Sequence, residues 1–160
     1  MRAKFLFIAV LSFITITSFS QAKSAVTDEE LTKYATVMDS IDEMSIAVKT
    51  ILSDMVASSE VVNNARYNEL SKIINDKAKL KEAEATPEEI AFINEVAEKK
   101  KTETAKINKA FQSLVKDNLG GAAYNKVKKA LASDAALKAK YDALMEEMAK
   151  DNGVAVEEAG

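Results

Sequence analysis

The chain has 160 residues, with 48% apolar and 29% charged side chains and a formal net charge of −3, which excludes an intrinsically disordered protein and suffices for one domain with a core. It contains neither Cys nor His, which excludes disulfides, Ser-His-Asp and Cys-His catalytic arrangements, the common zinc sites and Glu-x-x-His di-iron sites. One Pro and four Gly stand among many Ala, Lys, Glu and Leu residues, which favours an all-α fold.

The first 24 residues have the pattern of a secretory signal peptide. Basic residues within the first four precede a short apolar run over residues 5–17, and small polar residues follow. Cleavage after Ala22 or after Ser24 would leave small residues at positions −3 and −1. A retained membrane anchor is the alternative, but the run is shorter than the roughly 20 residues that a span needs. We therefore expect an exported protein, periplasmic or extracellular, whose only membrane contact is through the signal peptide.

The rest of the chain is expected to be one helical domain over residues 26–150, with a flexible tail over residues 151–160. Cleavage after Ala22 removes Arg2 and Lys4 and no acidic residue, so the net charge falls from −3 to −5. A mildly acidic domain argues against a nucleic-acid partner, because nucleic-acid binding relies on basic surface.

The first predicted helix starts at Thr27 and continues to about Val56. Thr27 and Glu30 form a capping box, and Val26 and Leu31 form the matching hydrophobic staple. The helix has three apolar heptad columns: Leu31, Met38, Ser45 and Leu52; Tyr34, Ile41, Val48 and Met55; and Val37, Met44 and Ile51. A two-stranded coiled coil needs only two such columns, so the wider stripe predicts contact with two neighbours in a bundle.

Two further long helices are expected. A loop within residues 57–64, where Ser58 or Ser59 could act as a cap, precedes a second helix that ends near Ala85. The third helix starts at a second capping box and ends near Lys116. Its capping box consists of Thr86 and Glu89, with Pro87 at the first helical position.

The C-terminal part is expected to form a pair of short helices. Asn118 and the following Gly120 and Gly121 can adopt the left-handed conformation that ends a helix. Asp134 then starts the last helix, which stops near Asp151. The predicted architecture is an antiparallel bundle of three long helices with a short C-terminal helical pair.

Two segments carry a family resemblance. They are VTDEELTKYA at residues 26–35 and LGGAAYNKVKKALASDAALKAKY at residues 119–141. They resemble the bacterial family called domain of unknown function 4168. The matching residues are Asp28, Glu29, Glu30, Leu31, Tyr34, Leu119, Tyr124, Asn125, Asp134 and Leu137. Gly120 departs from the pattern, because the family has Thr there and Gly is a weaker helix cap. The resemblance implies an exported helical protein, and it implies no activity, cofactor or site residue.

Three groups of side chains are candidates for chemistry. Carboxylates cluster at Asp39, Asp42 and Glu43, at Glu88 and Glu89, and at Glu146 and Glu147. Lysines cluster at residues 99–101 and at Lys126, Lys128 and Lys129. Carboxylate clusters can bind a hard cation and lysines an anionic membrane, but the ordinary role of both is a solvated helix face. Five methionines, Met38, Met44, Met55, Met145 and Met148, could line an apolar groove, although core packing is their commoner role.

These features predict a non-enzymatic, exported helical protein of the bacterial cell envelope that acts through protein–protein contacts. Its partner would be an envelope protein or a second copy of itself, and no metal or cofactor is expected. The alternative is a chaperone-like module or a carrier of lipids or other apolar ligands, which would leave apolar surface exposed near the methionines. A hydrolase or metal enzyme is the third hypothesis, and it would need carboxylates that converge in a cleft.

Overall fold

The computed structural model describes residues 25–151. The predicted signal peptide and residues 152–160 of the predicted tail lie outside this range. The described residues form helices and connecting turns without a strand, which confirms the all-α fold class. The elements are α1 (Asp28–Ala57), α2 (Asn64–Ile73), α3 (Lys77–Glu82), α4 (Pro87–Leu114), the π-helical turn η1 (Val115–Leu119), α5 (Gly121–Leu131) and α6 (Ala135–Asp151).

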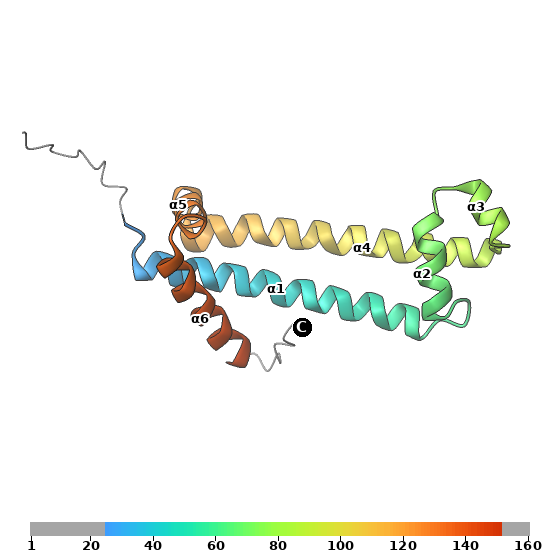
Figure 1. Cartoon of the computed structure of the whole chain (residues 1–160), viewed down its shortest axis with the longest axis horizontal. Helices are drawn as coiled ribbons and strands as arrows, with labels where there is room; N and C mark the ends of the chain where they lie inside the picture. The colour runs from blue at the N-terminus through green and yellow to red at the C-terminus, as the bar shows by residue number, and fades with distance from the viewer. Residues whose placement is uncertain (1–24, 152–160) are drawn as a thin grey trace, which may run out of the picture.

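Two long helices set the shape of the molecule. α1 and α4, of 30 and 28 residues, lie side by side and antiparallel along the long axis (Figure 1). The short helices α2 and α3 lie at the end where α1 stops, and α5 and α6 lie at the opposite end (Figure 1). α6 crosses α1 and diverges from it, so the central parts of α1 and α4 have only each other as neighbours among the described helices.

Both long helices begin where the sequence predicts. Thr27 Oγ1 accepts the Glu30 N–H at 3.1 Å, and Glu30 Oε2 accepts the Thr27 N–H at 2.9 Å. The corresponding distances in the Thr86–Glu89 box are 3.2 and 2.8 Å. Each reciprocal pair satisfies two backbone donors that a helix start leaves without a partner, which confirms both capping boxes.

The second long helix of the prediction is replaced by two short ones. α2 is capped by Asn63, whose Oδ1 accepts the Arg66 N–H at 2.9 Å, and not by Ser58 or Ser59. The chain then turns after Ile73, and Asp76 Oδ1 starts α3 by accepting two backbone N–H groups at 3.1 Å. Because Asp76 offers these donors a side-chain acceptor, the backbone leaves the helical path there. The molecule is therefore a two-helix hairpin with short helices at each end.

The chain reverses direction between α4 and α5 at Gly120. Of the three residues that could adopt a left-handed conformation, Asn118, Gly120 and Gly121, it is Gly120 that does so, with a φ of +83°, and Asn118 lies within η1. Gly120 also precedes α5 as its N-cap and provides no side-chain hydrogen bond, as its lack of a side chain predicts. The left-handed backbone suits glycine because no Cβ clashes there.

Buried side chains gather at the two ends of the hairpin. One cluster of buried residues lies at the α5–α6 end and consists of Leu31, Tyr34 and Val127; a second lies at the α2–α3 end and consists of Leu70, Leu80 and Ile93. On α1 no residue between Val37 and Val56 is buried, and on α4 none after Val96 is. Met44, Ile46 and Ile51, all in the central part of α1, are 38–40% exposed.

Candidate functional site

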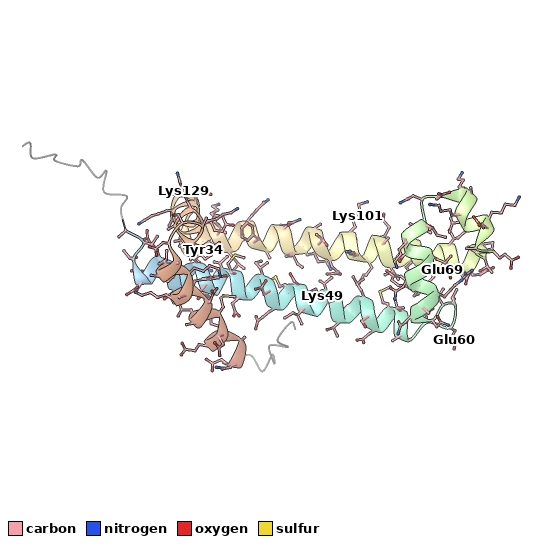
Figure 2. All side chains as sticks on the ribbon, viewed as in Figure 1. Tyr34, Lys49, Glu60, Glu69, Lys101 and Lys129 are labelled. Atoms are coloured by element: carbon pink, nitrogen blue, oxygen red, sulfur yellow. The ribbon has the colours of Figure 1, made fainter. Side chains whose placement is uncertain are left out.

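Aromatic side chains from four elements meet at the α5–α6 end. The Tyr34 ring of α1 stacks on Tyr124 of α5, with ring centroids 5.3 Å apart and an interplanar angle of 26°. Tyr141 of α6 meets Tyr34 edge-on at 5.7 Å, and Phe111 of α4 meets Tyr124 edge-on at 5.4 Å. Offset and edge-to-face arrangements are the favourable ones for aromatic pairs. We call these four residues the tyrosine cluster; Figure 2 labels Tyr34 within it.

Ion pairs surround the tyrosine cluster. Lys126 of α5 donates to both carboxylate oxygens of Glu30, at 3.0 and 2.8 Å, and Lys140 of α6 lies 3.2 Å from Asp28. The Lys126 ammonium is the main cause that lowers the pKa of Glu30, and the Thr27 N–H adds to it. One carboxylate therefore caps α1 and also joins it to α5.

The ten residues that resemble the family motif belong to this end of the molecule. Leu31, Tyr34, Leu119, Tyr124 and Leu137 contribute to its apolar core. Asp134 Oδ1 accepts the Leu137 N–H at 3.0 Å and so starts α6. Glu29 pairs with Lys33 in the next turn of α1 at 2.7 Å, Asp28 and Glu30 form the ion pairs just described, and Asn125 is exposed. The structure thus brings together segments that are about 90 residues apart in sequence.

The tyrosine hydroxyls are poorly suited to acid–base chemistry near neutral pH. Loss of hydration, followed by the charges of Tyr34 and Asp42, raises the pKa of Tyr141 to about 12. Loss of hydration beside Tyr124 raises the pKa of Tyr34 as well. Both hydroxyls hold their protons far above neutral pH, whereas a general base needs a pKa near the operating pH. The arrangement therefore favours a packing role.

The carboxylate clusters do not converge on a cation site within the described residues. No group of three or more Asp or Glu side chains in residues 25–151 is placed to hold a metal ion, and no polar or charged residue there is buried. Loss of hydration and the neighbouring Asp39 raise the pKa of Asp42, which lies beside Tyr141. Glu88 is exposed in the first turn of α4, and Glu146 pairs with Lys150 at 2.7 Å.

An open groove lies between α1 and α6, next to the tyrosine cluster. Leu31 and Thr32 line it from α1, and Ala143 and Leu144 line it from α6. Its charged lining residues, Asp28, Lys140 and Glu147, lie at the surface. Among the described residues that line the groove, no nucleophile and base are in hydrogen-bond contact.

Lysines of the predicted clusters form ion pairs or lie near an aromatic ring, and the five methionines are partly buried except for Met44. Lys99 pairs with Glu103 at 3.2 Å and Lys101 with Glu98 at 3.4 Å, whereas Lys128 lies 5.9 Å from the centre of the Tyr124 ring. Four methionines are partly buried, and Met44, at 38%, is among the exposed large apolar residues. Among residues 25–151 no helix is both long and apolar enough to cross a membrane.

An arginine at the α2–α3 end was missed by the sequence analysis. Arg66 contacts both oxygens of Glu89, at 2.7 and 3.0 Å, and donates to the Ala83 carbonyl at 2.9 Å. Arg66 is the main cause that lowers the pKa of Glu89. The sequence has only two arginines, Arg2 and Arg66, among many lysines. Because the guanidinium group can bind both oxygens of a carboxylate, this isolated Arg could have indicated a specific ion pair.

In comparisons with protein families, characterised proteins and solved structures, no family model, protein or structure matches this chain.

Proposed function

We propose that this chain is an exported, non-enzymatic helical protein of the bacterial cell envelope that acts through contacts with other proteins. The observation that carries the proposal is the pair of exposed apolar side chains on one side of the central part of α1, namely Met44 and Ile51. They lie on a hairpin whose two ends are closed by packed cores and ion pairs. An exposed apolar strip on a rigid frame is typical of an interaction surface.

The envelope assignment rests on the sequence. The first 24 residues support export, and the two segments that resemble domain of unknown function 4168 support a bacterial envelope protein. The same segments supply Tyr34 and Tyr124 to the tyrosine cluster, so a shared structural role is a reasonable explanation for the motif. The motif residues then stabilise the fold and leave the recognition surface to other parts of the chain.

Cell fractionation combined with N-terminal sequencing tests the export proposal. We expect the chain in the periplasm or medium, with a new N-terminus at Lys23 or Ala25. Cytoplasmic protein that retains Met1 would overturn it. A photo-crosslinker at position 44 tests the contact surface in living cells. Position 53 is the control, because it is exposed and lies nine residues further along α1, on the opposite side of the helix. Crosslinks from position 44 and few from position 53 are the expected result.

A chaperone-like or carrier module is the second candidate, and the exposure of Met44 and Ile51 favours it. Such a module would accept unfolded chains or lipids on the same strip. An environment-sensitive apolar dye separates the two candidates, because a small, shape-specific surface binds little dye whereas a promiscuous groove binds it strongly. Strong dye binding by the folded, monodisperse protein would favour the second candidate over the first.

A further inference from the structure

The third apolar column of α1 is only partly covered. Val37 is 1% exposed, but Met44 and Ile51, which follow it at seven-residue intervals, are 38% and 40% exposed. Residues seven apart lie on the same side of a helix, so the column emerges from the core at Val37 and continues in the open. The short helices at the two ends of the hairpin stop short of the central part of α1 (Figure 1). A stripe three columns wide thus lacks its second neighbour along this part.

The central parts of the two long helices carry opposite charge. Between residues 39 and 54, α1 has four acidic residues and one Lys; between residues 95 and 109, α4 has five Lys and three Glu. The ion pairs that Lys99, Lys101 and Lys106 form lie within α4, and the acids Glu43 and Asp54 of α1 form no ion pair with the described residues. Lys49 and Lys101 mark the central parts of the two helices in Figure 2.

The partner that α1 lacks has a definite chemistry. It is a helix of similar length with apolar spacing on one side and lysines beside it, lying antiparallel to α1. α4 has the lysines. Its apolar side lies against α1 of its own chain, but the aliphatic stems of its lysines can cover apolar side chains of a second copy. In a two-fold symmetric pair, α1 of each copy lies against α4 of the other, so the same attraction between acids and lysines occurs twice.

We propose that two copies of this chain associate through the open column of α1, with Met44 and Ile51 of each copy against the α4 lysine side of the other. This inference rests on the proposed function and names its partner as a second copy. Two central sections of about 18 residues, each roughly 27 Å long and 10 Å wide, offer about 500 Å² per copy. Stable interfaces bury about 800 Å² per partner, so the dimer is weak, with a dissociation constant on the order of micromolar.

The equilibrium is measured by analytical ultracentrifugation of the protein purified in the form that the producing cell accumulates, at protein concentrations from about 1 to 200 µM. The expected result is a concentration-dependent change from monomer to dimer that weakens with added salt, because exposed charges are screened. Ile51→Lys should weaken the dimer by at least tenfold. Ile46→Lys is the matched control, because Ile46 is equally exposed in the same part of α1 but points to a different side. A monomer throughout the range, or equal weakening by both variants, would overturn the proposal.

A charge exchange tests whether the partner is a second copy. A Glu43→Lys/Asp54→Lys variant and a Lys106→Glu/Lys109→Glu variant should each stay monomeric, because like charges then face each other across the dyad. Mixed together, the two variants should form a heterodimer, because opposite charges again meet on both sides. A mixture that stays monomeric while both variants remain folded by circular dichroism contradicts the proposal. Fractionation and in-cell crosslinking test the proposed function separately, because a monomeric chain can still crosslink to an envelope protein.

Discussion

The two ends of the hairpin use the same device with different side chains. At each end, the Glu of the capping box that starts a long helix also forms an ion pair with a basic side chain of a short helix. Glu89 pairs with Arg66, and Glu30 pairs with Lys126. Arg66 makes a two-pronged contact and also binds the Ala83 carbonyl, whereas Lys126 is a single ammonium between two oxygens. The Arg66 end packs mainly aliphatic residues together with Tyr67, and the other end packs the tyrosine cluster.

In this protein, the contacts that stabilise the hairpin of α1 and α4 are concentrated at its two ends. On α1 no residue between Val37 and Val56 is buried, and on α4 none after Val96 is, so the stability of the pair depends mainly on its ends. The capping-box Glu residues, Glu30 and Glu89, each use one carboxylate lone pair for the cap. The remaining lone pairs accept hydrogen bonds from a side chain of another helix, so the same residue also makes a tertiary contact. The ends therefore hold the two helices together, while apolar side chains in the centre of α1 stay partly exposed.

Truncation of the core at either end is expected to have the largest effect. Leu70→Ala and Leu31→Ala remove side chains that are 0% and 1% exposed, and each should lower the free energy of unfolding by about 2–5 kcal/mol. Urea denaturation measures the loss. Ile46→Ala, at an exposed position, is the control and should change stability by less than about 0.5 kcal/mol.

Hydrogen exchange shows whether the ends behave as separate units. Leu70→Ala should speed amide exchange in α2 and α3 more than in α5 and α6, and Leu31→Ala should do the reverse. The two losses should add in the double variant, because the sites lie in different clusters. Equal acceleration over the whole chain from either substitution would contradict the division into two ends.

Removal of the Glu89 charge sharpens the comparison between the two cation contacts. Glu89→Gln should cost about 1–3 kcal/mol, because it weakens charge-assisted hydrogen bonds from Arg66 and leaves that guanidinium without its main partner. Glu30→Gln should cost less, because Lys126 reaches solvent easily and makes a contact of simpler geometry. Chemical denaturation of both variants gives the ranking; a larger loss for Glu30→Gln would reverse our interpretation.

The reversal at Gly120 belongs to the tyrosine end alone. Gly120→Ala places a side chain at a φ of +83°, although nothing lies within 4 Å of its Cβ, so backbone strain alone should cost about 1–3 kcal/mol. Gly121→Ala is the control, because its Cβ is also free of contacts and the residue starts a helix, where Ala is favoured. Thermal unfolding should separate the two; similar melting temperatures would mean that the turn adapts without strain.

The sequence predicted what short-range chemistry determines. The Thr27 and Thr86 boxes were predictable because each contact spans three residues, and the same holds for Asp134 at the start of α6. The split between α2 and α3 was missed because Leu70 and Leu80 pack on the same cluster, so the apolar spacing continues across the turn at Asp76. A continuous pattern in the sequence then resembles a continuous helix.

The contacts that close the ends were not predictable from spacing. Glu89 is 23 residues from Arg66, and Glu30 is 96 residues from Lys126, so these pairs depend on how the helices lie in space. The tyrosine cluster has the same origin, because its rings come from four elements. The three-column stripe of α1 predicted two neighbours, but among the described helices only α4 lies along its central part.

Acid should weaken both ends of the hairpin. The folded protein lowers the pKa of Glu30 and of Glu89 below the ordinary value of 4.5, so the unfolded chain binds protons first as the pH falls. Their stabilisation is therefore complete above about pH 5 and is lost as the pH falls through the folded-state pKa values. Glu89→Gln should flatten this acid limb in α2 and α3, which hydrogen exchange at several pH values measures.

Alkali should weaken only the tyrosine end, and this smaller effect separates the two ends most cleanly. Tyr141 has a folded-state pKa of about 12 against an ordinary value of 10, so between these values the unfolded chain loses a proton that the folded chain keeps. Stability must then fall as the pH rises through this window. Tyrosinate absorbance should show delayed ionisation, and amide exchange should rise first in α5 and α6. Tyr141→Phe keeps the ring and removes the ionisable hydroxyl, so it should reduce the loss of stability at alkaline pH. If stability falls with rising pH as much in that variant as in the original protein, another group causes the effect.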